Sequence, residues 1–157
     1  MNSVERAVAL AARGFKVFPI KPNAKMPAFK NWQTWALDDP DFVRALWPVD
    51  RDYNVGISTR GLVVVDVDAG KGGLDELKKL GDLPPTYTVR SARGGIHLYF
   101  KNDTGQKFVG RAYSKRKDGS EVFAIDGVRG IDIRTDGNLT VGPGSVVEGG
   151  SYSVEVD

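Results

Sequence analysis

The sequence contains no cysteine among its 157 residues and only one histidine. Without cysteine, the chain cannot form a disulfide framework, a thiolate nucleophile or a zinc site built on thiolates. A chain of this length buries enough apolar surface to fold without such cross-links. Because disulfides are rare in reducing compartments, the lack of cysteine also fits a cytoplasmic protein, and we expect that location.

Long hydrophobic runs and a large excess of one charge are missing too. No stretch is long enough to cross a bilayer as a helix, and no basic segment precedes an apolar one at the start, as in a signal peptide. We therefore expect no membrane partner. The net charge of +2 at pH 7 permits a nucleic-acid partner without requiring one. Length and composition predict a single globular domain over residues 1–157.

Periodicity and turn residues predict an α/β (α+β) domain with a mixed sheet. Helical spacing of apolar residues, with Ser3 as the first cap and Pro40 as a second start, predicts helices over residues 3–13, 40–47 and 74–80. Alternating or continuous apolar runs predict strands over residues 15–20, 62–65, 86–90, 96–100, 122–125, 130–134 and 139–141. The lysine- and proline-containing residues 21–30 are expected to form an ordered loop.

Two acidic residues, Asp66 and Asp68, directly follow the continuous apolar run over residues 62–65. Residues two apart on a strand point to the same side, so both carboxylates project together from the end of the strand. Two carboxylates at an apolar edge repel each other, and a hard divalent cation such as Mg²⁺ or Mn²⁺ removes that penalty. We interpret the pair as metal ligands, and the alternative is a solvated turn.

A third acid, Asp132, lies on a predicted strand between Ile131 and Ile133. The two isoleucines share one face of the strand, which leaves Asp132 and Arg134 on the other. Three carboxylates from two strands could hold two metal ions and a triphosphate, an arrangement that serves in-line attack by a 3′-hydroxyl. The alternative is an Asp132–Arg134 pair on a solvated sheet face, which would stabilise the fold little.

The only histidine, His97, follows the pair Gly94-Gly95 on a predicted strand. An isolated histidine is more often packed in a core, but the glycines favour a site. They let the backbone approach a ligand closely, and their N–H groups can donate to phosphate. Arg93 and His97 would then add charge-assisted contacts to a polyphosphate. No nucleophile motif accompanies His97, so we do not expect it to activate a serine or cysteine.

Residues 106–117 carry five basic side chains and no acidic one: Lys107, Arg111, Lys115, Arg116 and Lys117. Such a run is most often a solvated loop. Beside a nucleotide site it would instead contact phosphates, and we hypothesise that it clamps triphosphate or template.

Together these segments resemble the primase-polymerase (Prim-Pol) domain of the archaeo-eukaryotic primase superfamily, found in phage and plasmid replication proteins. The family pattern is Asp-x-Asp or Asp-x-Glu after an apolar strand, then small-x-His, then a hydrophobic residue before an aspartate. The matching segments are Asp66-Val67-Asp68, Gly95-Ile96-His97 and Ile131-Asp132. Residues 18–20, 25–27, 83–86 and 130–145 look like the family's flanking segments. The resemblance covers essentially the whole chain.

The resemblance implies an RRM-like catalytic sheet packed against an N-terminal α/β unit. It implies a nucleotidyltransferase that joins dNTPs or NTPs on a single-stranded DNA template and primer, using two Mg²⁺ or Mn²⁺ ions. Asp66, Asp68 and Asp132 would bind the metals. His97 would contact the phosphates of the incoming nucleotide.

Looser matches to the family supply three further candidates for nucleotide contacts: Lys25, Ser91 and Arg93. Some relatives carry a zinc-binding stem between the second and third motifs. This chain has no cysteine there, and the basic residues 106–117 occupy the interval. Family proteins usually continue into a helicase domain, so such a domain in a longer protein is an expected partner. The expected location is then the cytoplasm of the host.

Two other functions explain part of the pattern. A glycosyltransferase would grip a sugar nucleotide through a metal on Asp66 and Asp68, but it gives no role to Asp132. A non-catalytic module would bind nucleotide or single-stranded DNA by stacking bases on aromatic side chains. Its candidates are Trp32, Trp35 and Tyr53, for which core packing is the commoner role.

Overall fold

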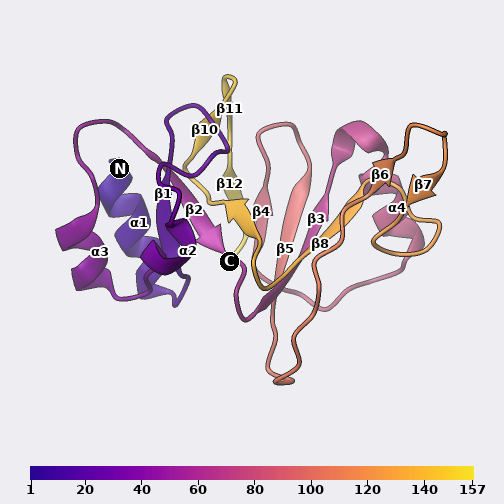
Figure 1. Ribbon diagram of the computed structural model, residues 1–157, viewed down its shortest axis with the longest axis horizontal. Coiled ribbons are helices and arrows are strands. Elements are labelled where there is room, and N and C mark those ends of the chain that lie inside the picture. Colours follow the sequence, from indigo (N-terminus) through magenta and orange to yellow (C-terminus); the bar gives the residue numbers. More distant parts are fainter.

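The structure is a computed structural model that describes residues 1–157, and its two main sheets lie side by side (Figure 1). The first has the order β1-β2-β9, and the second has the order β12-β4-β5-β3-β8. The strands of the first sheet are β1 (Val17–Ile20), β2 (Asn54–Ser58) and β9 (Leu139–Val141). Those of the second are β3 (Leu62–Val67), β4 (Thr88–Arg90), β5 (Ile96–Lys101), β8 (Ile131–Arg134) and β12 (Ser153–Val156).

The predicted α+β class is confirmed, but the sheets are not mixed. Every pairing between strands is antiparallel. The second sheet has the RRM-like arrangement that we expected: β3, the helix α4 (Gly73–Lys79), β4 and β5 form a split β-α-β unit in which β5 lies between β4 and β3. A crossover through α4 therefore connects strands that are not neighbours, so no parallel pair arises.

The first helix of the N-terminal unit begins at a well-defined cap. In α1 (Ser3–Ala12), the side chain of Asn2 accepts a hydrogen bond from the backbone of Glu5, and the Glu5 carboxylate accepts one from the backbone of Asn2. Ser3, which we expected to be the cap, instead accepts a hydrogen bond from Trp47 at 2.6 Å. The other helices are α2 (Trp32–Trp35) and α3 (Pro40–Leu46). No helix has the length and apolar character needed to cross a bilayer.

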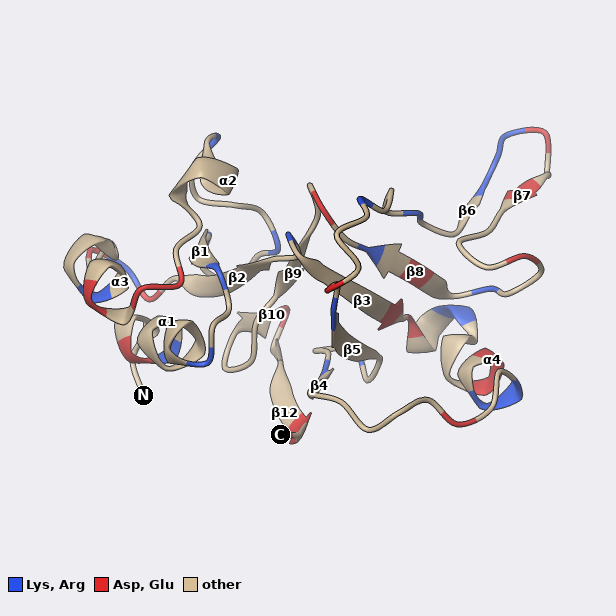
Figure 2. Cartoon of the chain, turned by 90° about the horizontal axis from the view of Figure 1, so that it is seen from below, with Lys and Arg blue, Asp and Glu red and all other residues tan.

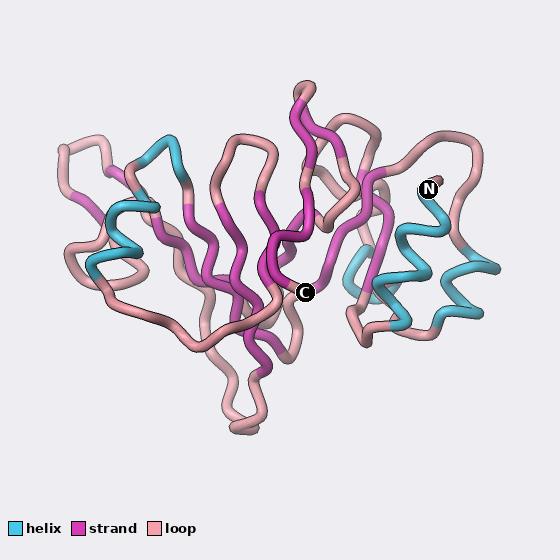
Figure 3. The backbone as a smooth tube through the Cα atoms, turned by 180° about the vertical axis from the view of Figure 1, so that it is seen from behind, coloured by secondary structure: helices cyan, strands magenta, loops and turns pink.

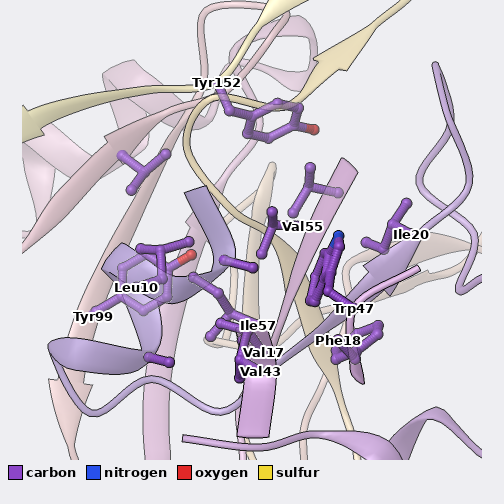
Figure 4. Close-up of a cluster of buried hydrophobic side chains, with 14 of the residues drawn as sticks. Leu10, Val17, Phe18, Ile20, Val43, Trp47, Val55, Ile57, Tyr99 and Tyr152 are labelled. Atoms are coloured by element: carbon purple, nitrogen blue, oxygen red, sulfur yellow. The ribbon is translucent and has the colours of Figure 1, made fainter. Parts of the chain in front are cut away.

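One hydrophobic core joins the N-terminal unit to the second sheet. Phe18 and Ile57 from the first sheet belong to the same buried cluster as Val64, Val89 and Tyr99 from the second. Figure 4 shows part of this cluster, with Tyr152 at its upper edge and Trp47 close to Phe18 and Ile20. Because the two sheets share a core, the position of the N-terminal unit relative to the second sheet is fixed by packing.

The two faces of the second sheet are different. Val67 and Ile131 belong to a smaller core under α4, against which Val65 also packs. Strand alternation then turns Val64 and Asp66 to the opposite face, away from α4. Figure 3, seen from behind, shows α4 beside this sheet and α1 and α3 at the far end of the molecule.

Several short elements were not predicted. The strand β2 is buried along its whole length, although its sequence Asn-Val-Gly-Ile-Ser alternates like that of a half-buried strand, and its Gly56 lies against the ring of Phe18. The strands β10 (Val146–Val147) and β11 (Gly150–Ser151) have two residues each and are too short to show a period, whereas β12 alternates in sequence but is exposed at every position. The predicted strand over 122–125 is wrong for most of its length. Only Glu121–Val122 (β7) is extended, paired with Ser114–Lys115 (β6) in a hairpin.

Candidate active site

Asp66, His97 and Asp132 lie beside one another on three neighbouring strands. In the pairing of β3 with β5, Asp66 is opposite His97, and in the pairing of β3 with β8 it is opposite Asp132. Directly opposed residues of an antiparallel pair point to the same face of the sheet. The imidazole Nε2 of His97 lies 3.2 Å from Oδ1 of Asp66. The structure thus brings together residues that are far apart in the sequence.

Arg134 connects the two opposed acids. Its Nε donates to Oδ2 of Asp66 at 2.6 Å, and a terminal nitrogen of its guanidinium lies 3.6 Å from Oδ2 of Asp132. From the sequence, Arg134 is expected only as a partner of Asp132, whereas its shorter contact in the structure is with Asp66. Both oxygens of Asp66 therefore have protein partners, His97 on one side and Arg134 on the other.

The two opposed carboxyl groups are shifted in opposite directions. Burial alone would raise the pKa of Asp66, but the hydrogen bond and charge of His97 and the charge of Arg134 outweigh it and lower this pKa to about 2. Burial raises the pKa of Asp132; the hydrogen bond from the Tyr113 backbone opposes this effect, and the charge of Asp66 adds to it. A nearby cation would therefore relieve Asp132 more than Asp66.

Asp68 is held at the turn that follows β3. Its backbone N–H donates to the carbonyl of Gly130 at 2.7 Å, and its carboxylate accepts from Gly70 at 2.8 Å. The Nζ of Lys71 lies 4.0 Å from this carboxylate, which is half exposed. A Cβ on Gly73 would collide with the carbonyl of Gly130. This close backbone contact locks the turn carrying Asp68 against the start of β8.

One cavity of about 460 Å³ is lined by all three acids. Six of the seven predicted site residues line it: Lys25, Asp66, Asp68, Ser91, Arg93 and Asp132. His97 lines a smaller neighbouring cavity of about 190 Å³, which shares Lys25, Asp66 and Arg134 with the first. A cavity of about 520 Å³ between α1 and β12 contains none of the predicted residues. The predicted residues thus gather at the acid cavity.

As the side chains stand, no group of three or more His, Asp or Glu residues is arranged to hold a metal ion. Each acid is bonded to the protein instead: Asp66 to Arg134, Asp68 to the backbone of Gly70, and Asp132 to the backbone of Tyr113 at 2.8 Å. The donor set nevertheless fits Mg²⁺ or Mn²⁺ in kind, because three carboxylates on one cavity offer only oxygen ligands.

Basic side chains form part of the rim of the acid cavity. Lys25 reaches it from the loop that follows β1, and Arg93 reaches it from the β4–β5 turn. Arg93 is largely exposed and forms an ion pair with Glu148. In the same turn, the Gly94 N–H donates to the carbonyl of Ser91 at 3.0 Å. The rim therefore combines positive charge from two parts of the fold that are distant in sequence.

Gly95 is needed for a different contact from the one we expected. We predicted that the glycines let the backbone approach a ligand. In the structure, a Cβ on Gly95 would collide with the carbonyl oxygen of Val67 on β3 and would lie 3.1 Å from Oγ of Ser91. Gly95, two residues before His97, therefore allows the start of β5 to pack tightly on β3, next to Asp66.

The Gly95→Ala substitution should destabilise the fold by about 1–3 kcal/mol or more, because the new methyl group overlaps backbone that cannot move freely. Gly94→Ala is the matched control, since Gly94 has φ +82° and open space around the Cβ position. It should cost only about 1 kcal/mol, for the backbone conformation. Urea unfolding of both variants measures the difference. Equal losses would contradict a packing role for Gly95.

Two residues of the site were missed by sequence analysis. Lys71 lines the acid cavity from the turn after Asp68, and its spacing of three from that acid is a local signal that could have been used. Tyr152 lines both cavities, and its ring centroid lies 5.9 Å from that of His97. It comes from the C-terminal segment, so no local pattern links it to the site.

The basic segment is attached to the acid Asp132. Arg111 exchanges two backbone hydrogen bonds with Ile133 on β8, at 2.8 and 2.7 Å, and the Tyr113 backbone donates to Asp132. The chain then enters the β6–β7 hairpin, where Figure 2 shows basic residues on the exposed loop. None of the five basic side chains of residues 106–117 takes part in an ion pair.

The aromatic side chains considered for base stacking are partly buried and pack against the N-terminal core. Trp32 lies against Phe18, with ring centroids 4.5 Å apart, and Trp35 lies against Trp47 at 5.8 Å. Tyr53 packs against the same core. Core packing, the commoner role, is the one that the structure gives them.

A comparison with protein families finds a match over residues 7–157, to the family described as bifunctional DNA primase/polymerase, N-terminal. A comparison with curated proteins finds no match.

Proposed function

Because the chain belongs to the bifunctional DNA primase/polymerase family, we propose that it joins nucleotides on a DNA template by a two-metal mechanism. The observation that supports this proposal is the convergence of Asp66, Asp68 and Asp132, from two strands and a turn, on one cavity. The family is one of nucleotidyltransferase-type enzymes. Neither the glycosyltransferase nor the base-stacking module accounts for Asp132 in the same cavity.

The family generally uses divalent metals. In this chain Asp66, Asp68 and Asp132 would hold Mg²⁺ or Mn²⁺, since they are the carboxylates that line the cavity. When bound, the ions would neutralise charge on the triphosphate and favour attack by the primer 3′-hydroxyl. Lys25 and Arg93, at the rim, would bind the phosphates of the incoming nucleotide, and Ser91 would donate to them.

His97 would support Asp66 through a direct contact with its carboxylate. Its Nε2 contact with Asp66 helps to keep that carboxylate ionised and oriented. Because His97 also lines the smaller cavity together with Lys25, its ring is positioned to reach a phosphate that Lys25 binds. This combines the phosphate contact that the family resemblance implies with a positioning role that the burial of His97 supports.

A primer-extension assay tests the proposal. The full chain should incorporate labelled dNTPs or NTPs onto a primed single-stranded template in the presence of Mg²⁺ or Mn²⁺, and EDTA should stop the reaction. Transfer of sugar from a nucleotide sugar, measured in parallel, should not occur. Absence of incorporation with either ion and both nucleotide types, from a folded protein, would contradict the proposed activity.

We also propose that residues 106–117 bind the single-stranded template. Their five basic side chains have no acidic partners, and the segment is hydrogen-bonded to β8 next to Asp132. Phe108 and Val109, both exposed, offer apolar surface to bases in the same segment. A strand bound here would lie close to the acid cavity.

Charge reversal of three of these residues, Lys115→Glu, Arg116→Glu and Lys117→Glu together, should weaken binding of single-stranded DNA. Each phosphate contact to a single strand contributes about 0.7 to the slope of log K against log salt, so losing three should reduce the slope by about 2. Fluorescence anisotropy over a salt series measures both quantities.

The control makes the same charge change elsewhere, in the exposed Lys30, Arg44 and Lys78, none of which forms an ion pair. If only the net charge mattered, both triple variants should bind DNA equally weakly. A local binding site predicts a larger loss of affinity for the variant with the substitutions at residues 115–117. Equal affinities would contradict a template site at residues 106–117.

The biological setting remains a prediction. The family resemblance implies replication of a phage or plasmid genome in the cytoplasm of a host cell, together with a helicase domain.

A further inference from the structure

We propose that Arg134 is a built-in counter-ion of the acid cavity, which holds Asp66 and Asp132 while no metal ion is bound and moves away when one enters. The inference rests on the proposed function, because it takes these two acids as metal ligands. It goes beyond that function by assigning a regulatory contact to a residue outside the predicted set.

The contacts of Arg134 distinguish it from the other cations of the cavity. Its guanidinium lies against both opposed acids, 2.6 Å from Asp66 and 3.6 Å from Asp132. Arg93 is paired with Glu148 at the rim, and Lys71 lies 4.0 Å from Asp68 alone. Arg134 is therefore the cation that neutralises the pair of acids on adjacent strands.

A metal ion and Arg134 compete for the same oxygen atom. Oδ2 of Asp66 accepts the hydrogen bond from Nε of Arg134, while Oδ1 faces His97. Mg²⁺ binds carboxylate oxygens at about 2.0–2.1 Å, so an ion on Oδ2 would be too close to the guanidinium. Two cations at this separation also repel each other in a partly buried site. Metal binding at Asp66 thus requires Arg134 to leave.

The side chain of Arg134 has open space into which it can move. Its side chain is 36% exposed and lines both the acid cavity and the smaller cavity beside it. A guanidinium released from Asp66 can turn into the acid cavity and bind a phosphate through two parallel N–H groups. Entry of the metal would then free Arg134 to contact a phosphate, so that metal binding favours nucleotide binding.

Mn²⁺ binding to the full chain, without nucleotide or DNA, tests the competition. Titration monitored by the EPR signal of free Mn²⁺ should give an affinity at least about tenfold higher for Arg134→Gln than for the natural sequence, because one competing charge is removed. Arg134→Lys keeps the charge but cannot contact both acids through separate nitrogens, and its affinity should lie between the two. Arg129→Gln removes an arginine that is paired with Glu121 at the surface, and it should leave the affinity unchanged.

A second measurement separates competition from a structural role. At saturating Ca²⁺, binding of a non-hydrolysable dNTP analogue to Arg134→Gln should be about tenfold weaker, since the released guanidinium no longer contacts phosphate. A purely structural residue would weaken both metal and nucleotide binding, whereas Arg134→Gln should change them in opposite directions.

The outcomes distinguish this inference from the proposed function. If Asp66→Asn loses the Mn²⁺ site while Arg134→Gln binds Mn²⁺ no better than the natural sequence, the counter-ion role is wrong and the metal site stands. If Asp66→Asn binds Mn²⁺ as well as the natural sequence, both the metal site and the counter-ion role are wrong. Should Arg134→Gln fail to fold by circular dichroism, Arg134→Lys decides, and an affinity equal to that of the natural sequence overturns the proposal.

Discussion

Asp66→Asn is expected to reduce template-directed incorporation at least about a thousandfold, because metal ions supply several kcal/mol of transition-state stabilisation and each 1.36 kcal/mol is a factor of ten. The same substitution should lower the free energy of unfolding at pH 7. The pKa of Asp66 is lowered to about 2 in the folded protein, against about 3.9 in an unfolded chain, which corresponds to roughly 2–3 kcal/mol.

The sign of this effect gives it a pH dependence. A carboxyl group with a lowered folded pKa stabilises the protein above its unfolded pKa of about 3.9, and this contribution is lost as the pH falls through about 2. Urea unfolding of the natural sequence and of Asp66→Asn should therefore differ most at neutral pH and converge below about pH 4. A stability difference that is constant down to pH 2 would contradict the pairing of Asp66 with Arg134 and His97.

Asp66→Asn also separates an enzyme from a non-catalytic binding module. An enzyme should lose incorporation while retaining its affinity for single-stranded DNA, because the basic residues 106–117 are unchanged. A binding module has no incorporation to lose. Anisotropy with labelled DNA, measured on the same preparations, gives this comparison directly.

Asp132→Asn is expected to remove activity to the same extent but to raise stability. Burial and the charge of Asp66 raise the pKa of Asp132, so its ionised form is disfavoured in the folded protein at pH 7. In the natural sequence the Tyr113 backbone donates a hydrogen bond to Asp132 at 2.8 Å. The asparagine keeps an oxygen that can accept this hydrogen bond, and it removes the unfavourable charge. The melting temperature without divalent ions should therefore rise.

This gain should also depend on pH in a defined direction. As the pH falls through the folded pKa of Asp132, the natural sequence becomes protonated there and the advantage of asparagine disappears. Thermal melts at pH 7 and pH 4 in EDTA measure the change. Asp126→Asn, in an exposed loop, should alter neither activity nor stability. A loss of stability in Asp132→Asn at pH 7 would contradict electrostatic strain between the two opposed acids.

Local sequence patterns predict which side chains lie on each face of a strand and where some helices begin. Alternation around Asp66 and Asp132 gives the correct face for both acids, and Pro40 gives the correct start of α3. The three-motif order of the family resemblance adds the correct expectation that acids from two strands gather. These features depend on residues only a few positions apart, which is why the sequence contains them.

Other features depend on pairing between distant segments. The register that sets Asp66 opposite both His97 and Asp132 follows from the packing of three strands, and no short pattern determines it. The contact of Arg134 with Asp66, rather than with Asp132 alone, follows from that register. The strand β12 forms because β4, which is distant in sequence, offers it unpaired backbone groups.

The chain passes more than once between the two main sheets. After β8 in the second sheet, the chain returns to the first sheet as β9, paired with β2, and then crosses again to end as β12 on β4. Because the polypeptide passes back and forth between the two main sheets, no single cut would yield two fragments that each contain one of these sheets complete. The protein should therefore melt in one all-or-none step, and an N-terminal deletion would disrupt the acid cavity although it removes none of the acids.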